Sequence, residues 1–137
     1  MSSFRFDNDK SDTVNLAGML NNIAQGFHQI VSLVAKSNNK PTPQHIKIEM
    51  VIVLGMAFGI GTLCSMNTET IIKGVKQYLS KTDDVDALFN HMMVAYSNPL
   101  YEEWFNYGGV TACAFMEENQ AEATMLDLAT RYFNAKD

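Results

Sequence analysis

The sequence has few of the residues that metal, redox or covalent chemistry requires. Its 137 residues include three histidines and two cysteines, and Cys64 and Cys113 lie far apart without C-x-x-C spacing. His45 and Glu49 share a helix face but supply only two ligands, and neither H-E-x-x-H nor E-x-x-H occurs. We therefore expect no metal, no cofactor and no enzyme activity. Two separated cysteines predict a reduced protein of the cytoplasm.

The sequence also lacks any excess of glycine or proline, a signal peptide at its polar start, and a surplus of positive charge. It contains eight glycines, three prolines and 47% hydrophobic residues, which excludes fibrous and disordered classes. The net charge of −5 argues against direct nucleic-acid binding. The length fits one domain with a real hydrophobic core.

The charge is divided unevenly along the chain. Residues 1–81 carry eight basic and five acidic residues, a net charge of +3, whereas residues 82–137 carry two basic and ten acidic residues, a net charge of −8. Two amphipathic halves with differently charged solvated faces explain this simply. The alternative is electrostatic complementarity between copies of the chain or with a basic partner.

Two long apolar stripes predict the main helices. Residues 1–11 resemble a flexible N-terminal arm, and a helix is expected over 13–36, capped by Asp12 or Thr13. A second helix is expected over 43–66, starting at Thr42-Pro43 and apolar on nearly every side, which is typical of a central helix. We expect the first helix to lie antiparallel beside the second.

Shorter helices are predicted in the rest of the chain. Asn67 or Thr68 caps a helix that ends near Ser80, and the segment 82–84 caps another. A short aromatic helix begins at Asn98-Pro99 and stops at Gly108-Gly109. Residues 110–134 suit a helix with an exposed joint at 117–120, although 110–116 is also compatible with a strand. The whole pattern predicts an all-α, single-domain bundle of five to six helices over residues 12–137.

Residues 50–66 form a run of seventeen residues without charge. This length is at the lower limit for a transmembrane helix, and no basic cluster flanks it. A buried core helix explains the same run, so we expect no membrane insertion.

Three glycines, Gly55, Gly59 and Gly61, lie in the same run. If residues 51–54 formed a strand, these glycines would resemble a phosphate-binding turn. The helical pattern around them favours another role, as small-residue notches where a neighbouring helix packs closely.

The most individual segment is 96–107, in which five of twelve residues are aromatic. Aromatic side chains either cover a core or form interface hot spots, and the segment has more of them than one short helix face can bury. We expect a partner-binding surface here with a charged rim, formed by Tyr96, Tyr101, Glu102, Glu103, Trp104 and Tyr107.

These patterns predict a non-enzymatic protein–protein interaction module, acting as a self-associating subunit, an adaptor or an inhibitor. One alternative is a small-molecule or nucleotide-binding domain with a pocket between helices. That pocket would be lined by Phe58, Met92, Tyr96, Trp104 and Cys113. A further alternative is an acidic inhibitor that occupies the nucleic-acid-binding groove of a target protein.

Overall fold

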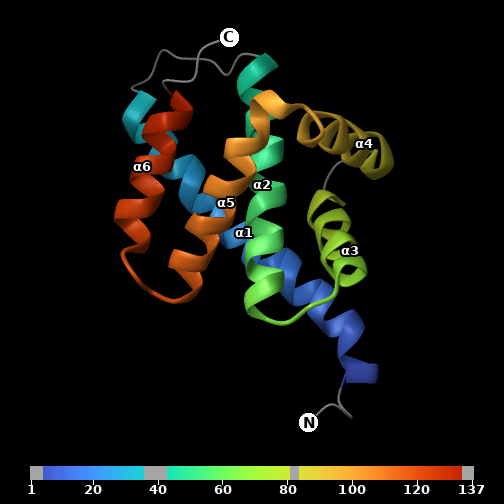
Figure 1. Ribbon diagram of the computed structural model, residues 1–137. Coiled ribbons are helices and arrows are strands. Elements are labelled where there is room, and N and C mark those ends of the chain that lie inside the picture. Colours follow the sequence, from blue (N-terminus) through green and yellow to red (C-terminus); the bar gives the residue numbers. More distant parts are fainter. Residues whose placement is uncertain (1–4, 36–42, 81–83, 134–137) are drawn as a thin grey trace.

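The computed structural model describes residues 5–35, 43–80 and 84–133, whose arrangement is shown in Figure 1. Their regular elements are α1 (Arg5–Ala35), α2 (Pro43–Leu63), α3 (Thr68–Leu79), α4 (Val85–Tyr96), the short 3-10 helix η3 (Pro99–Tyr101), α5 (Glu102–Met116) and α6 (Ala121–Phe133). No strand occurs among these residues, so the predicted all-α fold is confirmed. Residues 110–116 are helical.

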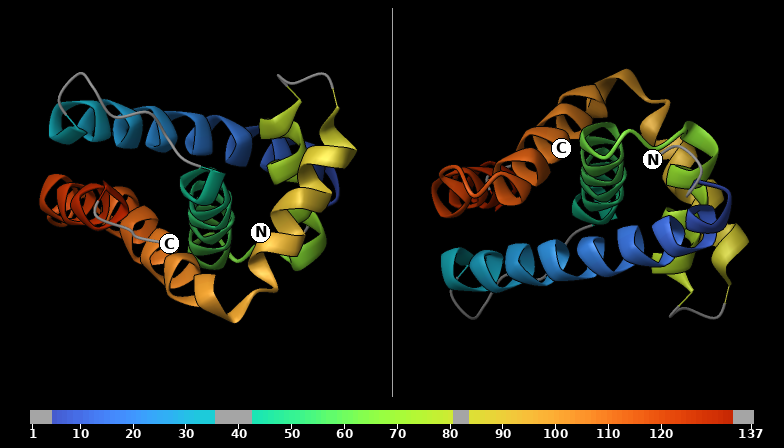
Figure 2. Two further views of the ribbon diagram at one scale, coloured as in Figure 1. Left: turned by 90° about the horizontal axis from the view of Figure 1, so that it is seen from above. Right: turned by 90° about the horizontal axis from the view of Figure 1, so that it is seen from below.

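Helix α2 lies at the centre of the molecule. Seen along its axis it is surrounded by the other helices, with α1 on one side, α5 and α6 on another, and α3 and α4 on a third (Figure 2). Every residue from 51 to 57 is buried. The apolar residues all round α2 therefore have partners on several sides, which fits the pattern of a central helix.

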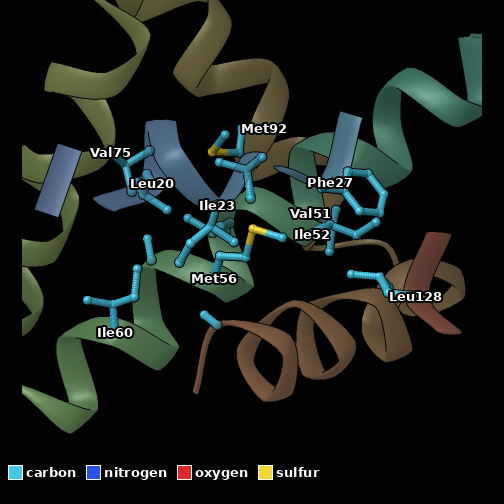
Figure 3. Packing of buried hydrophobic residues seen from close by; sticks show 14 of the residues in the cluster. Leu20, Ile23, Phe27, Val51, Ile52, Met56, Ile60, Val75, Met92 and Leu128 are labelled. Atoms are coloured by element: carbon cyan, nitrogen blue, oxygen red, sulfur yellow. The ribbon is translucent and has the colours of Figure 1, made fainter. Parts of the chain in front are cut away.

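The buried side chains come from several helices (Figure 3). Those that are at most 2% exposed and carry the most volume include Phe27 and Leu20 of α1, Ile52 and Met56 of α2, Met92 of α4 and Leu128 of α6. By length and composition, His45–Leu63 is the one helix of the described residues that could cross a membrane, and 56% of that window is buried inside the protein. Core packing accounts for its hydrophobicity.

Helix α1 differs from its prediction at its start. It begins at Arg5, so residues 5–11, expected in a flexible arm, are helical, and residues 1–4 lie outside the described part. Residues 5–12 contain neither proline nor glycine, so nothing in the sequence stops the helix from extending. α1 runs upward behind α2 in Figure 1 while α2 runs downward, so the two helices are opposite in sense, as predicted, but they cross obliquely (Figures 1 and 2).

Helix α2 ends at Leu63, before the predicted end at residue 66. Ser65 adopts a left-handed backbone conformation with φ 57°. The Met66 N–H donates to the Gly61 carbonyl at 2.8 Å and the Ser65 N–H donates to the Thr62 carbonyl at 3.2 Å. This pair of bonds is the Schellman motif, which terminates a helix by satisfying its last carbonyls.

Helix α5 also differs from its prediction. It continues through Gly108 and Gly109 to Met116, although the two glycines were expected to end it. The predicted joint at 117–120 is confirmed, since α5 and α6 are separate helices on either side of it. A second Schellman motif ends α5, with Glu118 at φ 52° and its N–H donating to the Phe115 carbonyl at 3.3 Å.

Candidate functional site

Helices α2 and α5 cross with their backbones in direct contact. A Cβ atom added to Gly55 would lie 2.0 Å from the Phe105 carbonyl oxygen, and one added to Gly108 would lie 2.2 Å from the Ile52 carbonyl oxygen. A Cβ on Gly59 would lie 2.8 Å from the Gly109 carbonyl oxygen. Only residues without a side chain allow this approach, which explains why glycine stands on both helices.

Gly61 serves a different helix. A Cβ atom there would lie 2.4 Å from the Ile71 Cδ1 atom of α3, so this glycine makes room for a side chain and not for a backbone. Because residues 51–54 are helical, the strand that a phosphate-binding turn needs is absent from this part of the structure. The hypothesis of a phosphate loop here is wrong.

Beside the crossing lies an open groove of about 610 Å³, which is lined by α2, α5 and the α5–α6 turn. Its apolar lining comes from Phe58 and Leu63 of α2 and from Phe105, Val110 and Ala114 of α5. Leu63 is 44% exposed and Val110 is 62% exposed. We call these lining residues, together with the glycines beneath them, the α2/α5 groove.

The charge of the α2/α5 groove has one sign. Of the described residues, Glu117 is the only charged one that lines it, and the exposed Glu118 follows in the chain. The other polar lining residues are neutral and include the amides Asn106, Asn119 and Gln120. The groove therefore combines apolar walls with an acidic end.

Cys113 also lines this groove, but its thiol is not activated. Desolvation by burial, and to a lesser extent the neighbouring Glu117 carboxylate, raises the pKa of the Cys113 thiol. Its Sγ lies 3.8 Å from the Gly59 carbonyl oxygen. A raised pKa keeps the thiol protonated at neutral pH and weakens it as a nucleophile.

The aromatic and acidic residues predicted as one partner-binding surface do not form one. Tyr101 is buried, at 7% exposure, so it cannot belong to an exposed surface. Tyr96 is 41% exposed and packs on Phe105, with ring centroids 4.9 Å apart. Tyr96 ends α4 and Tyr101 ends η3, whereas the other predicted residues lie on α5, and that is why the segment divides.

The remaining members of the predicted surface lie on α5, and Tyr107 among them contacts α6. Trp104 and Tyr107 pack edge to face with centroids 5.5 Å apart, and the Arg131 guanidinium lies 5.1 Å above the Tyr107 ring. Both aromatic side chains are half-buried, whereas Glu102 and Glu103 are exposed in the first turn of α5. There these carboxylates stabilise the positive end of the helix dipole.

The alternative pocket of five residues does not form either. Phe58 and Cys113 line the α2/α5 groove, whereas Met92 is a core residue at 1% exposure and Trp104 packs on Tyr107. Tyr96 contacts the groove residue Phe105 but does not itself line the groove. The sequence did not point to Val110 and Ala114, because the aromatic helix was expected to end before it reached them. It did not point to Leu63 of α2, because no local pattern shows that α5 crosses α2 beside it.

A polar cluster joins α1, α2 and α6 on another side of the molecule. His28 Nε2 is hydrogen-bonded to Glu49 Oε1, and the Tyr132 hydroxyl lies 3.5 Å from Glu49 Oε2. The His45 ring packs edge to face on Tyr132, with centroids 5.0 Å apart. Sequence spacing placed His45 and Glu49 on one helix face but gave no sign of His28 or Tyr132, which come from other helices.

The hydrogen bond to Glu49 and its negative charge raise the pKa of His28 against the opposing effect of burial. Burial, with a smaller contribution from Glu49, raises the pKa of Tyr132. No set of three or more histidine, cysteine or acidic residues within the described ranges is placed to hold a metal ion. We interpret the cluster as a link between three helices.

Comparison with other proteins adds no relative. No protein-family model matches the chain, and no curated protein sequence or solved structure is significantly similar to it.

Proposed function

We propose that the protein is a non-enzymatic interaction module that binds a helical segment of another protein in the α2/α5 groove. The observation that carries the proposal is the groove itself, open and largely apolar, with exposed Leu63 and Val110 on its walls. Exposed apolar surface of this kind commonly marks a binding site. Amphipathic helices dock in such grooves with apolar anchors spaced along one face.

The charges favour a partner helix with basic residues beside its apolar face. Glu117 is the only charged lining residue in the described part of the chain, and the segment 82–137 carries a net charge of −8. Two copies of the chain facing each other groove to groove would bring the two Glu117 carboxylates together, which is unfavourable. A basic helix from a different protein meets no such repulsion.

The absence of enzyme activity and the cytoplasmic location remain part of this proposal. Within the described ranges, the only titratable groups that line the groove are Glu117 and Cys113, and the raised pKa of Cys113 leaves it protonated. Cys64 and Cys113 are both free thiols, as is usual in a reducing compartment.

A fluorescent, amphipathic helical peptide of leucine and lysine tests the proposal, with a leucine and glutamate peptide of the same pattern for comparison. Fluorescence anisotropy should show that the lysine peptide binds and that the glutamate peptide does not. Val110→Asn removes an apolar contact without adding charge, and we expect it to weaken binding about fivefold to tenfold.

Val94→Asn is the matched control, because Val94 is 70% exposed on α4 and does not line the groove. Equal binding by both variants, or equal binding of both peptides, would contradict the proposed function.

A second copy of the chain is the other partner that we propose. The net charge of +3 in residues 1–81 against −8 in residues 82–137 supports association of the basic part of one copy with the acidic part of the next. Light scattering at low and high salt tests this. We expect a larger mass at low salt that falls as salt screens the charges, and a monomer at every salt concentration would exclude self-association.

A further inference from the structure

A second pocket lies on the other side of α2, at its first turns. It has a volume of about 310 Å³ and is bounded by α2, α4 and the segment that leads into η3. Its most buried lining residues are Ala95 at 4% exposure and Tyr101 at 7%, with the half-buried Met50 beside them. The exposed Ile46 and Val94 extend this apolar lining toward solvent.

The polar side chains of this pocket can all donate hydrogen bonds. Lys47, His91, Asn98 and Tyr101 all line it, and among the described residues no carboxylate does. The Asn98 Oδ1 atom already accepts a hydrogen bond from the Leu100 N–H at 3.0 Å, which leaves the amide NH₂ group as a donor. An ammonium, an imidazole, an amide and a phenol are thus gathered around an apolar lining.

This gathering contrasts with the rest of the C-terminal half. Residues 82–137 carry ten acidic residues, yet none of those that the structure describes lines the pocket. The helix neighbours of Lys47 four residues away, Pro43 and Val51, are uncharged, so no carboxylate of α2 is spaced to neutralise it. Within the described part of the chain, no ion pair involves Lys47 or His91.

From this arrangement we propose that the pocket between α2 and α4 binds a small amphipathic carboxylate, a molecule with one anionic group on a compact apolar body. The carboxylate accepts hydrogen bonds from Lys47 and from the other donors, and the apolar body contacts Met50 and Ala95. Charge-assisted bonds of this kind are stronger than bonds between neutral groups. The volume is at the lower end of small-ligand sites, which limits the ligand to a few carbon–carbon bonds.

Three probes of equal chain length test the proposal by NMR titration of the ¹⁵N-labelled full chain. Hexanoate supplies both features, 1-hexanol lacks the charge and hexylammonium reverses it. We expect hexanoate to shift the amide signals of Met50, Ala95 and Tyr101 at concentrations up to about 10 mM. We expect 1-hexanol to bind about threefold or more weakly and hexylammonium to leave these signals unchanged.

Variants of the exposed donors separate this site from general anion binding. Lys47→Met keeps most of the side-chain volume, and we expect it to weaken hexanoate binding about threefold, with a similar loss for His91→Gln. The matched control is Lys73→Met, which changes an exposed lysine on α3 that does not line the pocket.

No shift with hexanoate, equal shifts with hexanoate and 1-hexanol, or equal losses in Lys47→Met and Lys73→Met would overturn the proposal. None of these results bears on the α2/α5 groove, because Lys47 and His91 do not line it.

Discussion

Gly55 and Gly18 are both helical glycines, but their surroundings are opposite. A Cβ atom on Gly55 would meet the Phe105 carbonyl oxygen at 2.0 Å, whereas a Cβ atom on Gly18 would have no atom within 4 Å. The first glycine is required by a neighbouring backbone. The second only lowers helix propensity.

These two positions give a paired prediction for urea unfolding. Gly55→Ala must push α5 away from α2, and we expect the free energy of unfolding to fall by about 3 kcal/mol. Gly18→Ala should raise it by about 0.5–1 kcal/mol, because alanine favours the helix. Equal effects in the two variants would show that α2 and α5 do not approach this closely.

The His28–Glu49 hydrogen bond predicts a pH dependence of stability. Because the pKa of His28 is raised above 6.5 in the folded protein, the folded state holds this proton more tightly than the unfolded state. The stabilisation is therefore complete below pH 6.5 and is lost as the pH rises through the raised pKa. His28 is 52% exposed, so we expect less than about 1 kcal/mol.

Urea unfolding across this pH range measures the effect. In His28→Gln the free energy of unfolding should decrease less as the pH rises, because the contribution of the His28 proton is absent. Tyr132→Phe removes the hydroxyl 3.5 Å from the same carboxylate. This variant should keep the full pH dependence, because the proton resides on His28. An unchanged slope in His28→Gln would contradict the interpretation.

At the scale of single elements, the helix ends follow from local residues. Asn67 accepts a hydrogen bond from the Thr70 N–H at 2.8 Å and Asp84 accepts one from the Ala87 N–H at 3.1 Å, both within the predicted caps. Such bonds join residues close in sequence, and that is why α3 and α4 could be placed from the sequence alone.

The length of α5 could not be predicted in the same way. Gly108 and Gly109 commonly end helices, but here Gly108 lies against the Ile52 carbonyl of α2. The role of this glycine depends on a helix more than fifty positions away in the sequence, and no local pattern reports such a contact.

The α5–α6 turn gives a prediction at the element scale. Glu118 adopts φ 52°, a conformation that disfavours residues with a Cβ atom, whereas its neighbour Glu117 is at φ −91°. We expect Glu118→Gly to raise the free energy of unfolding by up to about 1 kcal/mol in urea. Glu117→Gly relieves no such conformation and should lower it, and the reverse order would contradict the assigned turn.

At the scale of the whole molecule, the central position of α2 followed from its composition, whereas the binding surface did not. An apolar helix with no polar face has to be surrounded, and α2 is surrounded (Figure 2). The aromatic segment 96–107 was identified correctly as unusual. Its residues do not form one surface. Tyr101 is buried, Tyr96 packs on Phe105, and Tyr107 lies between Trp104 and Arg131.

The α2/α5 groove could not be predicted from the sequence, for a related reason. Its walls come from Phe58 and Leu63 on one helix and Val110 and Ala114 on another, and neither set is distinctive by itself. Only the crossing of the two helices at their glycines gives these side chains a shared solvent-facing space. The site is a property of the assembled helices.

Paramagnetic NMR with a spin-labelled peptide tests the central claim, that this groove binds a basic amphipathic helix, most directly. A nitroxide at the middle of the leucine and lysine peptide broadens the signals of nearby amides in the ¹⁵N-labelled protein. We predict that broadening is concentrated on residues 58–63 of α2 and 105–114 of α5, and that Val110→Asn reduces it there. Broadening spread evenly over the exposed acidic residues Asp84, Glu102 and Asp127, with no preference for the groove, would contradict the account.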